Sequence, residues 1–149
     1  MEKPKFVYVT YINSTPEKVW EALTNPEFTR QYWGGLRVES DWKKGSSVKY
    51  IKEVGKVHLE GKVLQVDPPL LLSYTWAADA SFPAEGDEET RVTFELSTSD
   101  GVTKLITTHE GFVAGSTLLG KISNGWPAVL SSLKSLLETG KAIPISCKG

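Results

Sequence analysis

The sequence predicts an α+β fold in which a curved antiparallel β-sheet wraps around a long C-terminal α-helix, with two short helices after the first strand. The first hundred or so residues form short alternating segments typical of strands. A single helical pattern follows over residues 125–139. Its apolar face consists of Trp126, Val129, Leu130, Leu133, Leu136 and Leu137. A sheet that closes around a helix can enclose space, so we expect a ligand pocket between them.

Length and composition limit the classes of protein to consider. The 149 residues fit one domain over 1–149, with a tail from about residue 141 that we expect to pack poorly. Seventeen Lys and Arg balance eighteen Asp and Glu, which argues against nucleic acid or an anionic membrane as the partner. The sequence shows neither a signal peptide nor a membrane span, so we expect a cytoplasmic protein. The single cysteine, Cys147, precludes an internal disulfide.

The N-terminal part predicts a strand and two short helices. Residues 5–12 are rich in aromatic and β-branched side chains, as strands are. Thr15 can cap a helix over about 16–23, with a proline at its first position. Asn25 and Pro26 then begin a second helix that ends at Arg30 or Tyr32.

The rest of the chain predicts a series of strands and the final helix. The strands expected are 37–42, 47–53, 57–66, 70–77, 90–97 and 103–112. The pair Asp100-Gly101 suits a hairpin turn, and residues 79–89 form an exposed loop. The final helix is expected to begin near Ser123 or Asn124 and to end at Gly140.

The segment 112–124 is predicted to be a flap over the pocket or a plain connection. Residues 115–121 superficially match the start of a phosphate-binding loop. However, Ile122 stands where that motif needs a hydroxyl for magnesium, and the neighbouring strands predict hairpins instead of a strand–helix–strand unit. We therefore exclude a phosphate-binding loop.

Aromatic side chains supply the main functional signal. Tyr74 and Trp76 alternate with the same parity as Leu72, and Phe94 shares a face with Val92, so these side chains converge on the helix. The candidate pocket residues are Trp33, Tyr50, Tyr74, Trp76, Phe94, Thr107, His109, Trp126 and Leu130. The alternative is that the same rings only fill the core.

His109 is the best candidate for acid–base or hydrogen-bond chemistry. Its strand parity turns it inward beside Trp126, whereas Glu110 must point to the opposite face. Two roles are open for it, a proton-transfer group and a hydrogen-bonded structural histidine. His58 lies on a face that looks solvated, and two separated histidines with one tail cysteine do not make a zinc site. We expect no metal and no cofactor.

Several short motifs together resemble a known family. They are Val19-Trp20-Glu21-Ala22-Leu23-Thr24 with Pro26, Tyr32-Trp33-Gly34, Gly61-Lys62-Val63 leading to Asp67-Pro68-Pro69, Tyr74-Thr75-Trp76, and Gly125-Trp126. The chain, from about Val7 to Glu138, resembles bacterial proteins similar to the C-terminal domain of the activator of the heat-shock protein 90 ATPase, within the START/Bet v 1-like (SRPBCC) superfamily. This resemblance implies a helix-grip fold with a hydrophobic pocket.

The resemblance implies three kinds of function, because the fold serves lipid or hormone binding, polyketide cyclisation and chaperone activation. The first hypothesis is binding of a small hydrophobic or amphipathic ligand without a set reaction. The second is a cyclase-like enzyme in which His109 or an inward tyrosine moves a proton. The third is a module that contacts heat-shock protein 90. Co-chaperones of this kind carry a separate N-terminal domain, and here only a few residues precede the first strand. The chain is expected to be a monomer or a homodimer.

Overall fold

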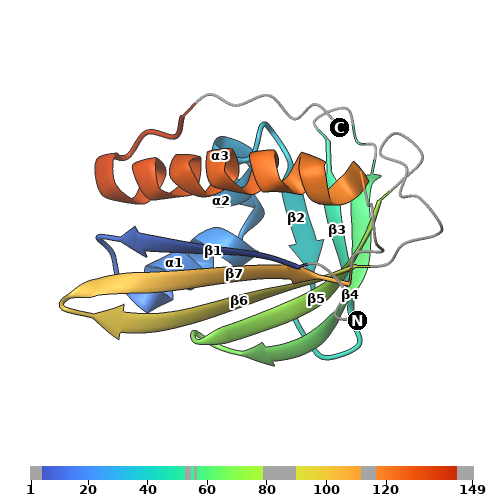
Figure 1. Cartoon of the computed structure of the whole chain (residues 1–149), viewed down its shortest axis with the longest axis horizontal. Coiled ribbons are helices and arrows are strands. Elements are labelled where there is room, and N and C mark those ends of the chain that lie inside the picture. The colour runs from blue at the N-terminus through green and yellow to red at the C-terminus, as the bar shows by residue number, and fades with distance from the viewer. Residues whose placement is uncertain (1–4, 53–54, 56, 79–89, 112–116, 144–149) are drawn as a thin grey trace.

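A seven-stranded antiparallel sheet and three helices make up the computed structural model, with α3 lying across one face of the sheet (Figure 1). The structure describes residues 5–52, 55, 57–78, 90–111 and 117–143. In chain order the elements are β1 Lys5–Ile12, α1 Pro16–Thr24, α2 Pro26–Tyr32, β2 Arg37–Ser40, β3 Ser47–Ile51, β4 Val57–Asp67, β5 Leu71–Ala78, β6 Thr90–Ser99, β7 Val102–Glu110 and α3 Thr117–Thr139. The predicted α+β class and order of elements are confirmed.

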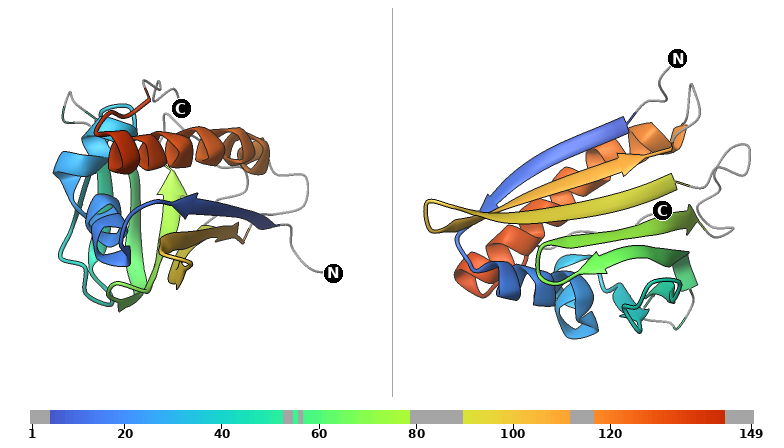
Figure 2. Two further views of the ribbon diagram at one scale, coloured as in Figure 1. Left: turned by 90° about the vertical axis from the view of Figure 1, so that its left-hand side faces the viewer. Right: turned by 90° about the horizontal axis from the view of Figure 1, so that it is seen from below.

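The sheet curls so that one face surrounds α3 (Figure 2). Its strand order is β1-β7-β6-β5-β4-β3-β2, so the edge strands β1 and β2 come from the first third of the sequence. β7 alternates strictly between partly and fully buried residues, with Thr103, Leu105, Thr107 and His109 on the buried face. One face of β7 therefore belongs to the core, as its period-two pattern predicts.

A tight backbone approach at Gly61 helps to bend the sheet between β4 and β5. A Cβ atom on Gly61 would lie 1.8 Å from the carbonyl oxygen of Thr75. Only glycine, which has no Cβ, avoids this clash. The hydroxyl of Thr75 accepts the N–H of Lys62 at 2.8 Å. The register then shifts by one residue between Val63 and Gln65, as in a β-bulge. Bulges bend and twist a strand, so this stretch contributes to the curvature that Figure 2 shows.

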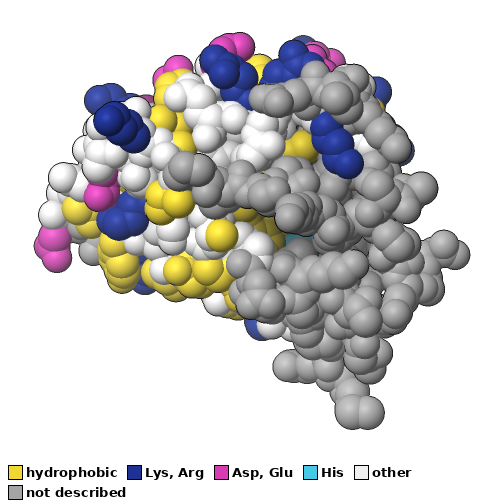
Figure 3. Space-filling model, turned by 90° about the horizontal axis from the view of Figure 1, so that it is seen from above, with side chains coloured by type: hydrophobic (Ala, Val, Ile, Leu, Met, Phe, Trp, Pro, Cys, Tyr) yellow, Lys and Arg dark blue, Asp and Glu magenta, His cyan; other side chains and the backbone are white. Residues whose placement is uncertain are grey.

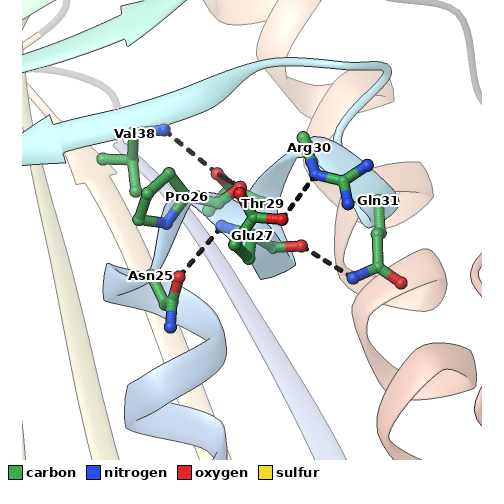
Figure 4. A network of polar contacts seen from close by, with 7 residues as sticks. All are labelled: Asn25, Pro26, Glu27, Thr29, Arg30, Gln31 and Val38. Atoms are coloured by element: carbon green, nitrogen blue, oxygen red, sulfur yellow. Dashed lines mark hydrogen bonds and ion pairs between the residues drawn. The ribbon is translucent and has the colours of Figure 1, made fainter.

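The corner between α1 and α2 is built on Asn25, which serves both helices. Its backbone N–H donates to Glu21 O at 2.8 Å and so closes α1, while its side-chain oxygen accepts the N–H of Glu27 at 2.9 Å and caps α2 (Figure 4). Thr29 then accepts the N–H of Val38 at 3.0 Å and fixes α2 to β2. The predicted cap at Thr15 and the predicted start of the second helix at Asn25 and Pro26 are both confirmed.

The predicted hairpin between β6 and β7 is also confirmed. β6 ends at Ser99 and β7 begins at Val102, which leaves a two-residue turn. Both turn residues have positive φ, 49° at Asp100 and 83° at Gly101. This is the left-handed conformation that Asp-Gly adopts readily and that matches the twist of the flanking strands.

The prediction of a strand over 37–42 is wrong at its C-terminal end. β2 stops at Ser40, and Trp42 has a φ of 53°, outside the extended region. Its backbone N–H donates to Ser40 Oγ at 3.0 Å and its indole N–H to Thr24 O at 3.1 Å. These two bonds hold Trp42 in a conformation that a bulky residue rarely adopts.

The predicted start of the last helix is also wrong. α3 begins at Thr117, about two turns before Ser123, and continues through Pro127. The prediction rested on Ser123 and Asn124 as caps, and it placed Pro127 in the first turn, whereas a proline inside a helix removes one backbone hydrogen bond. Packing of the apolar residues on either side of Pro127 offsets that cost, because Trp126, Val129 and Leu130 are buried. The prediction of a flap or plain connection is thus wrong for residues 117–124, while 112–116 lie outside the described residues.

The remaining boundaries differ from prediction by one or two residues, as helix and strand ends commonly do. The predicted loop 79–89 lies outside the described residues. Residues 141–143, at the start of the tail predicted to pack poorly, bond to α3: the hydroxyl of Ser132 donates to Ile143 O at 2.9 Å and accepts its N–H at 3.1 Å. No helix in the described ranges is long and apolar enough to cross a membrane.

The bend at Gly61 can be tested by adding one methyl group. Gly61→Ala should lower the free energy of unfolding by about 2–3 kcal/mol, because the new Cβ must displace backbone. Gly125→Ala is the matched control, since its Cβ meets nothing within 4 Å and alanine favours the helix. Urea denaturation measures both variants. A Gly61→Ala protein as stable as the parent would contradict the close approach.

Candidate ligand-binding site

Five aromatic side chains form a closed ring of contacts between the sheet and α3. The distances between ring centroids are 4.8 Å for Trp33 and Tyr50, 6.2 Å for Tyr50 and Tyr74, and 6.1 Å for Tyr74 and Phe94. The circuit closes through Trp126, 5.8 Å from Phe94 and 5.2 Å from Trp33. We call these five residues the aromatic cluster; all of them are buried.

Each member of the aromatic cluster comes from a different element. Trp33 follows the last residue of α2, and its N–H donates to Thr29 O at 2.8 Å. The cap at Asn25 and the hydrogen bond between Thr29 and Val38 fix α2 (Figure 4). They thereby position Trp33, the residue that follows α2. Tyr50, Tyr74 and Phe94 point inward from β3, β5 and β6, and Trp126 comes from α3. The cluster therefore depends on the whole fold.

The buried tyrosines provide neutral hydrogen-bonding groups. The hydroxyls of Tyr50 and Tyr74 lie 2.6 Å apart and share a hydrogen bond. The Tyr32 hydroxyl donates to Ala22 O at 2.9 Å. Burial raises the pKa of all three phenols well above its ordinary value, and the neighbouring phenol Tyr74 raises the pKa of Tyr50 further. These hydroxyls are therefore neutral donors and acceptors at physiological pH.

His109 joins α3 to the sheet. The indole N–H of Trp126 donates to His109 Nδ1 at 3.0 Å, and His109 Nε2 lies 2.7 Å from the hydroxyl of Thr90. Because an indole N–H can only donate, Nδ1 is the acceptor and the ring proton is on Nε2, which donates to Thr90. Burial lowers the pKa of His109 to about 3. The imidazole is thus neutral, with a protein partner at each nitrogen.

The structure brings most of the predicted pocket residues to this region. Thr107, His109 and Leu130 are buried with the aromatic cluster, and the predicted position of His109 beside Trp126 is confirmed. The side chains of Trp76 and His58 lie outside the described part of the structure. Glu110 points to the other face of the sheet and pairs with Arg91 at 3.0 Å, as the strand parity predicts.

Sequence reasoning missed four polar or aromatic groups of this region. Tyr32 and Trp42 contact the aromatic cluster, at 6.4 Å from Trp33 and 6.5 Å from Tyr74. Thr90 binds His109, and Thr10 lies on the buried face of β1. The parity of Thr90 with Val92 was the available signal for an inward hydroxyl.

Described residues line two hollows on the outside of the molecule. One, of about 490 Å³, is bordered by Trp42 together with the ends of α1, β2 and β3. The other, of about 430 Å³, lies on the outer face of the sheet beside Arg91 and Glu110. No member of the aromatic cluster lines either hollow. Trp42 connects the first hollow to the interior, because its ring also meets Tyr74.

The described part of the face on the side of α3 carries both Lys or Arg and Asp or Glu side chains, and no large patch of one sign is visible there (Figure 3). Within the ranges that the structure describes, no three His, Cys, Asp or Glu side chains gather where they could hold a metal ion.

The curved sheet gripping α3, with the aromatic cluster between them, defines a helix-grip protein of the SRPBCC type. Residues 13–138 match the family model described as "Activator of Hsp90 ATPase homolog 1-like protein". The chain belongs to this family. No match was found among curated proteins.

Solved structures agree with this assignment. The chain is similar to protein MLL2253 from Mesorhizobium loti, with 29% identity and a TM-score of 0.77 over 91% of this chain and 97% of that one. It is similar to ChR145 from Cytophaga hutchinsonii, with 28% identity and a TM-score of 0.76 over 94% and 97%. The Aha1 dimer from Colwellia psychrerythraea shares the fold, with 24% identity and a TM-score of 0.76 over 93% and 99%.

The buried state of His109 predicts a pH dependence of stability. The ordinary pKa of histidine is about 6.5, so the unfolded chain takes up a proton before the folded one. The stabilisation that the neutral His109 contributes to the folded state is complete above pH 6.5 and is lost as the pH falls toward 3. Between pH 7 and pH 5 this loss should reach about 2 kcal/mol.

His109→Gln should have a lower free energy of unfolding than the parent at pH 7. The difference between the two proteins should be about 2 kcal/mol smaller at pH 5, because only the parent loses the contribution of a neutral His109. The difference between the two free energies of unfolding is free of the pH dependence of the carboxylates, because both proteins contain them. Urea denaturation at both pH values measures the gap, and a constant gap would contradict a neutral buried His109.

Proposed function

We propose that the chain binds a small hydrophobic or amphipathic molecule between the sheet and α3. The aromatic cluster is the observation that carries this proposal. Aromatic walls with a few polar groups are typical of small-molecule sites. The phenols of Tyr50 and Tyr74 supply such groups, and both are neutral. In this proposal the candidate pocket residues named from the sequence form the lining.

A cyclase-like activity is the alternative within the same site. It needs a group whose pKa lies near the working pH, since such a group takes and returns a proton efficiently. His109 has a pKa of about 3, and Trp126 and Thr90 bind its two nitrogens. This geometry favours a positioning role for His109, in which it holds Trp126 against the sheet. An intact turnover in His109→Gln would exclude His109 as the acid or base of any reaction.

A co-chaperone role is a further alternative, and its only support is the family description, which refers to the activator of Hsp90 ATPase. In this alternative a protein partner would bind the surface, which is compatible with a ligand inside. A pull-down with the heat-shock protein 90 of the same cell that recovers no complex would remove this alternative.

The ligand proposal predicts that shortening one ring of the cluster weakens binding. Trp33 touches both Tyr50 and Trp126, so Trp33→Leu should bind the neutral dye Nile red about tenfold more weakly, or about 1.4 kcal/mol. Tyr11→Leu is the matched control, because Tyr11 is exposed on the outer face.

Fluorescence titration gives both affinities, and urea denaturation confirms that each variant is folded. Equal weakening in the two variants, or none in Trp33→Leu, would place dye binding outside the cluster and overturn the proposal.

We also infer that the chain forms a homodimer through edge strand β1. Three side chains on its outer face are exposed, 49% for Val7, 44% for Val9 and 50% for Tyr11. An apolar stripe on an edge strand favours pairing with another strand. The Aha1 protein from Colwellia psychrerythraea, which shares the fold, is described as a dimer.

α3 leaves part of this edge for a second copy. Lys134 Nζ donates to Tyr11 O at 2.6 Å, and Glu138 accepts the N–H of Asn13 at 2.7 Å. The hydrogen bond from Lys134 lowers the pKa of Glu138, which keeps this pair charged. The pair occupies the backbone at the C-terminal end of β1, so pairing between copies is confined to residues 5–9.

A charge placed on this stripe should separate the dimer. Val9→Lys is expected to sediment as a monomer at concentrations where the parent is a dimer, because each copy would bring a lysine into the apolar contact. Leu64→Lys is the control, since Leu64 is 37% exposed on β4. Sedimentation velocity measures both. A parent that is monomeric, or a Val9→Lys dimer, would refute the β1 interface.

A further inference from the structure

We propose that Thr10 and Thr107 form a subsite that binds an uncharged oxygen of the ligand, a hydroxyl or a carbonyl, beneath α3. This inference rests on the proposed ligand binding between the sheet and α3. Both side chains are buried, with 8% of Thr10 and none of Thr107 exposed. Neither hydroxyl has a hydrogen-bond partner in the structure. Buried polar groups without partners are rare in native proteins and call for an explanation.

The other buried hydroxyls show that this fold supplies partners where they serve stability. Among the described residues, five further buried threonines and serines all make side-chain hydrogen bonds: Thr29, Ser73, Thr90, Thr103 and Ser132. Valine has nearly the same shape as threonine and carries no polar group to desolvate. The hydroxyls of Thr10 and Thr107 therefore destabilise the ligand-free protein, which is expected of groups kept for binding.

The register of the sheet places the two hydroxyl-bearing side chains close together. Thr107 pairs with Tyr8, and Thr10 pairs with Leu105, so Thr10 and Thr107 are diagonal neighbours on the inner face. The Cβ atoms of such neighbours lie somewhat under about 7–8 Å apart. Two O–H···O bonds of about 2.8 Å that meet at one atom span about 5.6 Å. One ligand oxygen can thus accept a hydrogen bond from both threonines.

The charge of the surroundings defines the class of ligand. Among the described buried side chains there is no Asp, Glu, Lys or Arg. At the rim of β1 the ammonium of Lys134 is bound to Glu138 at 2.6 Å and to Tyr11 O. An ionised carboxylate or amine beside Thr107 would be buried without a countercharge, at a large desolvation cost. The subsite therefore suits an alcohol, a phenol or a ketone on an apolar skeleton.

Access to the subsite requires a side chain to move, since both hydroxyls are sealed from solvent. Tyr8 lies directly opposite Thr107 on edge strand β1 and is partly buried, with its ring stacked on Phe6 at 6.2 Å. An edge side chain that already touches solvent shifts at a lower cost than a residue of the aromatic cluster. Tyr8 is therefore the side chain whose movement admits a ligand, in a copy of the chain whose residues 5–9 are not paired with a second copy.

The test compares three probes that differ in one substituent: naphthalene, 1-naphthol and 1-naphthoate. The parent protein should bind 1-naphthol at least tenfold more tightly than naphthalene, and 1-naphthoate no more tightly than naphthalene. In Thr107→Val the preference for 1-naphthol should fall to about twofold, while naphthalene affinity stays within twofold of the parent. Thr10→Val should show the same loss. Thr108→Val, the next residue on the opposite face, should keep the full preference.

Equilibrium dialysis provides the affinities, and the midpoint of urea denaturation without ligand should rise in Thr107→Val. Equal binding of naphthalene and 1-naphthol by the parent, or an unchanged preference in Thr107→Val, would overturn the subsite alone. A lower denaturation midpoint in Thr107→Val would also overturn it, because the hydroxyl would then have a stabilising partner. If the parent binds none of the three probes, the pocket proposal fails and the subsite fails with it.

Discussion

The hydrogen bond from the Trp126 indole to His109 is the contact on which the arrangement of the interior depends. This bond is buried, and it fixes α3, the only long helix among the described residues, to β7, the strand next to the edge strand β1. Trp126 also closes the circuit of rings through Trp33 and Phe94. Without α3 in this position the inner face of the sheet would be exposed to water, so the helix and the aromatic cluster stabilise each other. His109 can accept the indole N–H only while it is neutral, and burial keeps it neutral.

Curvature is the second constraint, and local backbone features meet it. The close approach of Thr75 to Gly61 and the register shift after Val63 bend β4 against β5. The corner at Asn25 then brings Trp33 over the concave face, where it meets Tyr50. These features lie far from one another in sequence, yet each positions part of one aromatic cluster.

Sequence patterns predicted the features that depend on neighbouring residues. The parity of His109, the Asp100-Gly101 turn and the helix start at Asn25 and Pro26 follow from local rules, and all three are confirmed. Patterns failed where distant contacts override local preference. Ser123 and Asn124 were predicted to cap the last helix, but α3 begins earlier and continues through Pro127, with Trp126 and Leu130 buried on either side. Trp42 was predicted to lie in a strand, but its N–H groups donate to a carbonyl of α1 and to a serine hydroxyl, which hold it in another conformation. The partners of buried hydroxyls, such as Thr90 with His109, depend on strand register and could not be predicted from the sequence.

The protonation states of the interior bear on what it can do. Burial raises the pKa of Tyr32, Tyr50 and Tyr74 and lowers that of His109, so every one of these groups is neutral at physiological pH. A general acid or base works best with a pKa near the pH of the reaction, and these shifts lead away from it. The same shifts suit recognition, because neutral hydroxyls and an imidazole held by two partners can orient a ligand without a countercharge. An interior that suppresses ionisation at four positions is better fitted to hold an uncharged molecule than to transform it.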